Sequence, residues 1–178
     1  ITQNIDGLDR KAGNKSFIPI HGSIDKVTKF HSQNFVPDLE DAPWQEIQME
    51  LNKNDSKSLK NLLLESFKIS VKTMSPEPQI SLKPYVLLFD EYYTELYNIS
   101  RAEQMFNEAS HFIFMGTSFS VNITNMALKT ALTRGCKITI VDPKPIDLKI
   151  EGVEYFTMTA QKYIKLFSSW DDYLFDNK

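Results

Sequence analysis

The sequence predicts an α/β protein: a Rossmann-like, mostly parallel sheet with helices on both faces, plus a small helical domain. Apolar runs of strand length alternate with amphipathic helical patterns along most of the chain. One polar stretch, 24–82, breaks this alternation. A chain of 178 residues is long enough for one sizeable core. We therefore assign 1–23 and 83–178 to a Rossmann-like domain, and 24–82 to a small inserted domain.

Strands and helices alternate in the larger part. The run 85–90 is apolar almost throughout, as in a strand that is buried on both faces. Further strands are expected at 111–115, 136–141 and 152–158. Helices are expected at 99–109, 121–133 and 159–170, where apolar residues recur at helical spacing. Short links between these elements imply parallel neighbours joined by right-handed crossovers.

The inserted stretch predicts one clear helix, around 56–70. Leu59, Leu62, Leu63 and Phe67 recur there at helical spacing. Apolar packing is expected to hold this domain together. Its expected core consists of Phe30, Phe35, Trp44, Ile47, Leu51, Leu62 and Phe67.

Composition excludes several classes of protein. A formal net charge of −3 gives no electrostatic case for a nucleic-acid partner. No apolar run approaches the length needed to cross a bilayer, so no membrane partner is expected. Cys136 is the single cysteine, which excludes an internal disulfide framework and fits a reducing compartment, the cytoplasm or nucleus. Its place at the start of an apolar run predicts a buried thiol at a strand edge.

Two polar clusters follow apolar runs near the start of the chain. Gln3-Asn4-Ile5-Asp6 follows the first run, and His21-Gly22-Ser23 follows the second. The ends of strands are where open α/β sheets bind ligands. Taken singly, each cluster is more often an ordinary loop or turn than a functional site.

Together with three later segments, these clusters resemble the catalytic core of the sirtuins, the NAD-dependent protein-lysine deacylases. Residues 83–91 (KPYVLLFDE) resemble the family's RPxVVxFGE segment, and residues 115–121 (MGTSFSV) resemble its GTSLxV segment. Residues 138–142 (ITIVD) resemble its late strand, which usually ends in Asn. The five segments follow the family's order along the chain.

This resemblance implies an NAD site with named roles. Asn4 would hold the ribose hydroxyls and a water, with Gln3 along the same ribose. Asp6 would accept the amide protons of nicotinamide, with Ile5 as an apolar wall. His21 would be the base that activates a ribose hydroxyl, a task that suits the near-neutral pKa of histidine.

Two later positions have both a functional and a structural interpretation. Gly116-Thr117-Ser118 lies between a strand and a helix, where it would contact the adenosine ribose and phosphates or cap the helix. Asp142 stands where the family usually has Asn. It would bind the adenosine ribose hydroxyls or cap a turn before Pro143.

The resemblance also places the acyl-lysine substrate beside Val86, Phe89, Asp90 and Glu91. Asp90 replaces the family's glycine and adds a negative side chain where a substrate peptide pairs by strand addition. This replacement puts a standard acetyl-lysine peptide in doubt. Phe89 would wall the acyl tunnel, or be the last core residue of its strand.

Two family features are missing from the sequence. The four zinc-binding cysteines fall in register on Lys29, Ser32, Ser75 and Pro78. Since a structural zinc needs four Cys or His ligands, we predict no metal, and a surface role for His31. The family's Gly-Ala-Gly-Ser phosphate loop has no counterpart either, so we expect this chain to be the C-terminal part of a longer polypeptide.

Three functions remain open at this level. The first is NAD-dependent deacylation of a protein or peptide, which releases nicotinamide and O-acyl-ADP-ribose. The second is NAD hydrolysis or ADP-ribosyl transfer, which the Asp90 replacement favours. The third is a non-catalytic scaffold with the sirtuin fold.

Overall fold

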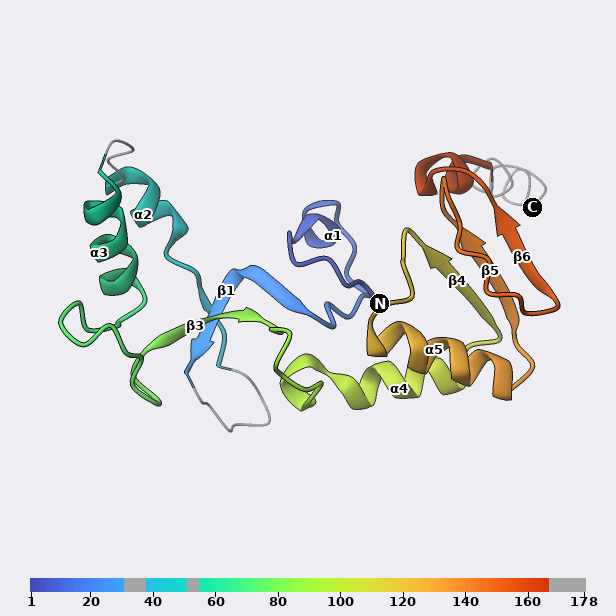
Figure 1. Cartoon of the computed structure of the whole chain (residues 1–178), viewed down its shortest axis with the longest axis horizontal. Coiled ribbons are helices and arrows are strands. Elements are labelled where there is room, and N and C mark those ends of the chain that lie inside the picture. The colour runs from blue at the N-terminus through green and yellow to red at the C-terminus, as the bar shows by residue number, and fades with distance from the viewer. Residues whose placement is uncertain (31–37, 51–54, 167–178) are drawn as a thin grey trace, which may run out of the picture. The chain divides into compact units, whose positions relative to one another are not determined.

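The computed structural model describes residues 1–30, 38–50 and 55–166. The chain divides into two compact units, Ile1–Ala102 and Glu103–Lys178 (Figure 1). The boundary falls inside helix α4, Ile99–Glu108. The assignment of 1–23 and 83–178 to one domain stays a prediction.

The second unit contains a parallel three-stranded sheet. Its strands are β4 (His111–Met115), β5 (Lys137–Val141) and β6 (Val153–Phe156), in the order β4-β5-β6 (Figure 1). Helix α5, Asn122–Thr133, connects β4 to β5 and packs against β4. The predicted strands and connecting helix are therefore confirmed, with shifts of one or two residues at some ends.

The core of this unit follows from the position of β5. Because β5 pairs on both sides, four of its five residues are buried; they are Ile138, Thr139, Ile140 and Val141. Helix α5 turns Ile123, Ala127 and Ala131 inward at four-residue spacing. Cys136 lies just before β5 and is partly buried, with its thiol 3.4 Å from the Ala109 carbonyl.

A closing helix follows β6, as predicted. Residues 160–166 are helical, and Tyr163 is buried against Phe156, with ring centroids 5.0 Å apart. Leu166, three residues further along this helix, is half exposed. Residues 167–170 lie outside the described residues.

The first unit contains an antiparallel sheet. Its strands are β1 (Gly22–Lys29), β2 (Glu40–Asp41) and β3 (Leu82–Val86), in the order β2-β1-β3. Figure 1 shows β1 beside β3. The prediction of a strand at 85–90 in the parallel sheet is thus wrong. The strand begins earlier and ends at Val86, because the chain then turns and leaves Leu88 and Phe89 exposed to solvent.

The small domain packs on this sheet through a compact apolar cluster. Helices α2 (Trp44–Glu50) and α3 (Ser56–Ser66) both contribute to it. Its buried residues are Val27, Ile47, Phe67 and Leu82, with Ala42, Trp44, Leu62, Leu63 and Ile69 packed around them. Trp44, Ile47, Leu62 and Phe67 were predicted core residues. Phe30 is partly buried outside this cluster, and Phe35 and Leu51 lie outside the described residues.

Helix α3 has clear sequence signals at both ends. Asp55 caps its start by accepting a hydrogen bond from the Lys57 N–H at 3.0 Å. The helix ends at Ser66, and Lys68 takes a left-handed conformation with φ 55°.

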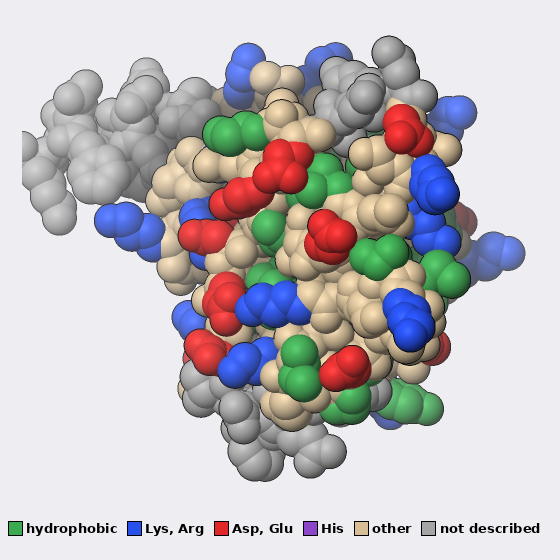
Figure 2. Space-filling view, turned by 90° about the vertical axis from the view of Figure 1, so that its left-hand side faces the viewer, with side chains coloured by type: hydrophobic (Ala, Val, Ile, Leu, Met, Phe, Trp, Pro, Cys, Tyr) green, Lys and Arg blue, Asp and Glu red, His purple; other side chains and the backbone are tan. Residues whose placement is uncertain are grey.

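On the face that Figure 2 shows, acidic and basic side chains are interspersed with hydrophobic ones. That no nucleic acid binds remains a prediction.

No described helix is both long enough and apolar enough to span a bilayer.

Candidate functional site

Two segments that are far apart in the sequence are joined beside His21. Thr2 and Pro19 form an isolated parallel bridge. The Thr2 N–H donates to the Ile18 carbonyl at 2.9 Å, and the Ile20 N–H donates to the Thr2 carbonyl at 3.0 Å. Ile18 and Ile20 are fully buried and anchor this pairing in the core. The first polar cluster is thereby held next to the histidine.

Both ring nitrogens of His21 have partners in the chain. Nδ1 lies 3.1 Å from the Gln3 carbonyl oxygen, and Nε2 lies 2.8 Å from the Tyr93 hydroxyl. A carbonyl oxygen only accepts, so Nδ1 carries the proton of the neutral imidazole. Nε2 is then the basic nitrogen and accepts from the Tyr93 hydroxyl.

The protonation state of His21 follows from its surroundings. Burial lowers the pKa of its imidazole below the ordinary value, and the hydrogen bond to the Gln3 carbonyl opposes this only in part. Among the described residues, no carboxylate or ammonium group contacts the ring. His21 is therefore a neutral base at physiological pH.

The polar side chains of the first cluster face solvent. Asn4 is exposed, and within the described part of the chain its side-chain amide has no hydrogen-bond partner. Asp6 is exposed as well, and one carboxylate oxygen accepts from the Leu8 N–H at 3.0 Å. The Ile5 carbonyl accepts from the Ile24 N–H at 2.8 Å, which fixes the loop to β1. The amide and carboxylate are thus open to a polar ligand.

Gly22, the first residue of β1, fixes the backbone next to the histidine. Its φ of 82° lies in the left-handed region that favours glycine. A Cβ at this position would stand 1.9 Å from the Tyr85 carbonyl oxygen. Next to it, the His21 carbonyl accepts from the Leu87 N–H at 3.0 Å. The chain after β3 therefore passes directly against the histidine backbone.

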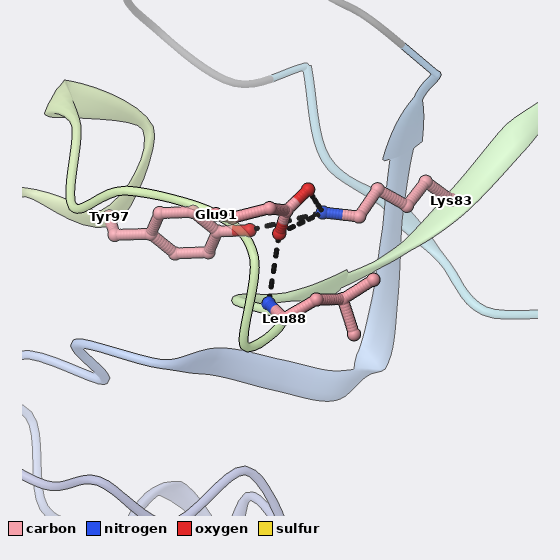
Figure 3. A network of polar contacts seen from close by, with 4 residues as sticks. All are labelled: Lys83, Leu88, Glu91 and Tyr97. Carbon is pink, nitrogen blue, oxygen red and sulfur yellow. Dashed lines mark hydrogen bonds and ion pairs between the residues drawn. The ribbon is translucent and has the colours of Figure 1, made fainter. Parts of the chain in front are cut away.

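The loop after β3 is held by Glu91 (Figure 3). Its carboxylate accepts from Lys83 Nζ at 2.5 and 2.6 Å and from the Leu88 N–H at 2.9 Å. Tyr97 lies alongside, with its hydroxyl 3.4 Å from Lys83 Nζ. Burial is the main reason why the pKa of the Tyr97 phenol is raised, and the negative charge of Glu91 raises it further. Glu91 thus has a clear structural role in this loop.

The same loop presents an apolar tip. Phe89 is fully exposed at 109%, and Leu88 is exposed at 51%. The interpretation of Phe89 as the last core residue of its strand is therefore wrong. Asp90 is exposed, and Val86 is partly buried at the end of β3. A role in substrate binding for these residues stays a prediction.

We expect the Lys83–Glu91 pair to matter more than an exposed pair. Lys83→Met should lower the free energy of unfolding by about 1–3 kcal/mol, because it leaves the partly buried Glu91 carboxylate without its cation. Lys26→Met is the matched control, since its partner Asp41 is 87% exposed, and its effect should be clearly smaller. Urea unfolding of both variants measures the difference. Equal losses would contradict the structural role of Glu91.

The second unit contains the other predicted ligand-binding loop. The Gly116 N–H donates to the Val141 carbonyl at 3.1 Å, so the loop begins beside the end of β5. Thr117 Oγ1 accepts from the Phe119 N–H at 3.3 Å, and the Ser118 hydroxyl contacts that of Ser120 at 2.6 Å. The N-cap of α5 is Val121, which makes no side-chain capping bond. The helix-capping interpretation of Thr117 and Ser118 is therefore wrong.

Asp142 caps the turn that follows β5. Its Oδ1 accepts from the Lys144 N–H at 2.7 Å, as an Asx turn requires. The interpretation of Asp142 as a turn cap is confirmed. Its other carboxylate oxygen does not take part in the turn, and binding of the ribose by Asp142 stays a prediction.

In the described residues, no group of three or more His, Cys, Asp or Glu side chains could hold a metal ion. His31 and Ser32 lie outside them.

Tyr93 is the site residue that sequence reasoning missed. It is separated from His21 by 72 positions, and no spacing in the sequence indicates their contact. The signal available was a pair of tyrosines directly after the FDE segment. Either tyrosine fits an ordinary loop, so only the folded chain selects Tyr93.

These features define an α/β protein in which a neutral histidine base stands beside a solvent-facing amide and carboxylate. A family model described as the Sir2 family matches residues 1–123, and the chain belongs to that family. The resemblance to sirtuins is thereby confirmed, and four of its five sequence segments lie within the matched residues.

Curated relatives and solved structures support the same assignment. The chain is 30% identical over 135 residues to the NAD-dependent deacetylase sir2E of Dictyostelium discoideum, covering 70% of this chain and 36% of that protein. It is 29% identical over 174 residues to an NAD-dependent protein deacetylase of Sulfurisphaera tokodaii, covering 93% and 59%. The chain thus spans about a third to three fifths of the length of these relatives.

The fold matches solved Sir2 structures. A Sir2 homologue in complex with ADP-ribose aligns with a TM-score of 0.69 at 19% identity, covering 99% of this chain and 61% of that chain. A Sir2 structure with a p53 peptide and NAD+ aligns with a TM-score of 0.66 at 18% identity, covering 96% and 62%. At this identity the likeness establishes the fold, which confirms the predicted Rossmann-like α/β class.

Proposed function

We propose that the native polypeptide is an NAD-dependent protein-lysine deacylase that releases nicotinamide and an O-acyl-ADP-ribose. The observation that carries the proposal is the placement of His21, whose Nδ1 is bonded to the Gln3 carbonyl, next to the exposed side chains of Asn4 and Asp6. Relatives that are named NAD-dependent deacetylases or deacylases support the same reaction.

The residues of the first unit fit a dinucleotide ligand. NAD would supply a ribosyl–nicotinamide bond that breaks when an acceptor attacks the ribose carbon. Asn4, whose exposed amide has no hydrogen-bond partner among the described residues, would bind ribose hydroxyls, and Gln3 would lie along the same sugar. Asp6 would accept the nicotinamide amide protons beside Ile5. His21 would take the proton from a hydroxyl during the reaction.

In the second unit, four residues would bind the adenosine half of NAD. A Cβ on Gly116 would meet no atom within 4 Å, so the backbone there is open to close approach by a ligand. Thr117 and Ser118 offer hydroxyls in the same loop. Asp142 offers the carboxylate oxygen that does not cap its turn. Acidic side chains bind ribose hydroxyls in other dinucleotide sites.

We assign the acyl-lysine substrate to the loop after β3. Val86 lies at the end of the strand, and the exposed side chain of Phe89 offers apolar surface to an acyl chain. Asp90 favours a second candidate, NAD hydrolysis or ADP-ribosyl transfer. By the resemblance to sirtuins, its exposed carboxylate would stand where strand addition by a peptide needs a clear backbone. We also propose that the protein is located in the cytoplasm or nucleus, because a single cysteine fits a reducing compartment.

The test is nicotinamide release from NAD by the native polypeptide, with and without a pool of acyl-lysine peptides. We expect release that depends on the peptides, together with free lysine and O-acyl-ADP-ribose by mass spectrometry. Release that ignores peptides would favour the hydrolase or transferase. Absence of release under both conditions would leave the non-catalytic scaffold.

A further inference from the structure

Tyr93 is placed by contacts on both sides along the chain. Before it, Glu91 is fixed by Lys83 and by the Leu88 N–H. After it, the Tyr85 hydroxyl donates to the Leu96 carbonyl at 2.6 Å, and the Tyr97 ring stacks on Tyr85 with centroids 5.3 Å apart. The segment that contains Tyr93 is therefore tied to β3 at two points, which limits the positions that its side chain can reach.

The phenol of Tyr93 is directed at the basic nitrogen of His21. The two rings are nearly parallel, with 24° between their planes and centroids 5.8 Å apart, and the hydroxyl lies 2.8 Å from Nε2. Since Nδ1 already donates to Gln3, the phenol O–H is the donor and Nε2 the acceptor. Both side chains are partly buried. The lone pair that would take a proton from a ligand is thus already engaged by Tyr93.

On the basis of the proposed function, we propose that Tyr93 relays the proton between a ligand hydroxyl and His21. The ligand hydroxyl gives its proton to the phenol oxygen, while the phenol gives its own proton to Nε2. The phenol is regenerated, the imidazole becomes an imidazolium, and the electron pair of the broken O–H bond stays on the ligand oxygen. The Gln3 carbonyl stabilises the imidazolium through Nδ1.

The chain offers a matched control for this relay. Tyr92 is the neighbouring residue and is 86% exposed, and no contact between it and His21 is present. Tyr92→Phe and Tyr93→Phe remove the same hydroxyl from adjacent positions. A general loss of loop stability would affect both variants, whereas loss of the relay would affect only Tyr93→Phe.

The experiment measures nicotinamide release and its pH profile for Tyr93→Phe, Tyr92→Phe, His21→Ala and the double variant His21→Ala/Tyr93→Phe of the native polypeptide. Tyr93→Phe should lower kcat about 10- to 100-fold with little change in KM for NAD, while Tyr92→Phe behaves as wild type. In the His21→Ala background, Tyr93→Phe should add no further loss, because both residues act in one step. Wild-type kcat in Tyr93→Phe, or an additive loss in the double variant, overturns the relay.

A second measurement is independent of turnover. The pKa of His21, followed by NMR and assigned with His21→Ala, should rise in Tyr93→Phe, because a donor to Nε2 stabilises the neutral ring. The acid limb of the pH profile should move in the same direction. An unchanged pKa overturns the inference. If wild type releases no nicotinamide, the proposed function fails, and this titration still decides whether Tyr93 holds His21.

Discussion

Gly22→Ala is expected to destabilise the first unit by at least about 3 kcal/mol and to abolish activity. The new Cβ would stand 1.9 Å from the Tyr85 carbonyl oxygen, a backbone atom that belongs to β3 and cannot swing aside. An alanine at φ 82° adds left-handed strain. Relief requires β1 and β3 to separate, which also moves His21, whose carbonyl is bonded to the Leu87 N–H.

Gly13→Ala separates the two causes of the expected loss of stability in Gly22→Ala, the close approach to Tyr85 and the left-handed backbone strain. Gly13 has φ 85°, but a Cβ there would meet no atom within 4 Å. It should therefore cost only the left-handed strain, about 1–2 kcal/mol. Denaturant unfolding of both variants, with circular dichroism to confirm the fold, gives the comparison. Similar losses for the two alanines would show that the close approach to Tyr85 is unimportant.

The sequence predicted the second unit well because its signals are local. Strands buried on both faces appear as short apolar runs, and the prediction for β4 matches its bounds, His111–Met115. Helix α5 shows its inward face by the four-residue spacing of Ile123, Ala127 and Ala131. Each element carries its own pattern, so neither partner nor register had to be known.

The first unit was predicted less well because its strands depend on each other. The strand β1 contains Ser23, Asp25, Lys26 and Lys29, and its Val27 is buried against residues that lie much later in the chain, Ile47, Phe67 and Leu82. The apolar run after β3 looked like a continuing strand, yet the bonds of Glu91 to Lys83 and Leu88 turn the chain there. A turn that depends on the side chain of Glu91 bonding Lys83 and Leu88 has no recognisable local pattern in the sequence.

Some features of the candidate site could likewise be predicted from the sequence, and others needed the folded structure. The resemblance to sirtuins assigns Gln3 and His21 to one site from the sequence alone, and the Thr2–Pro19 bridge is the physical means of their approach. The capping roles at Thr117 and Ser118 were wrong because α5 begins only at Asn122, with Val121 as its N-cap. The contact of Tyr93 with His21 needed the loop geometry, which only tertiary packing determines.

His21→Ala is expected to lower the rate of product formation by about 10²- to 10⁴-fold while NAD binding persists. The substitution removes the base, and leaves the solvent-facing groups of Asn4 and Asp6 in place. Nicotinamide release measures the first effect and calorimetric titration with NAD the second. His111→Ala is the control, since His111 bonds Thr139 Oγ1 in the second unit and has no place in the proposed chemistry.

The assignment of His21 as the base also predicts how activity and folding stability change with pH. Because burial lowers the pKa of His21 below its ordinary value of about 6.5, the neutral base persists at pH 6.5, and activity should fall only at lower pH. The folded chain also binds this proton less tightly than the unfolded chain. The His21 contribution to folding stability is therefore constant above about pH 6.5 and declines as the pH falls through that value toward the folded pKa.

The two pH effects distinguish the base from a bystander. In His21→Ala, the part of the stability decline that His21 causes should vanish together with turnover, whereas His111→Ala should retain both. If His21→Ala keeps wild-type turnover, the proton acceptor lies elsewhere and the bond to Gln3 is only structural. If turnover is lost but the stability profile is unchanged, His21 is not buried as a neutral ring, and its lowered pKa cannot explain activity at neutral pH.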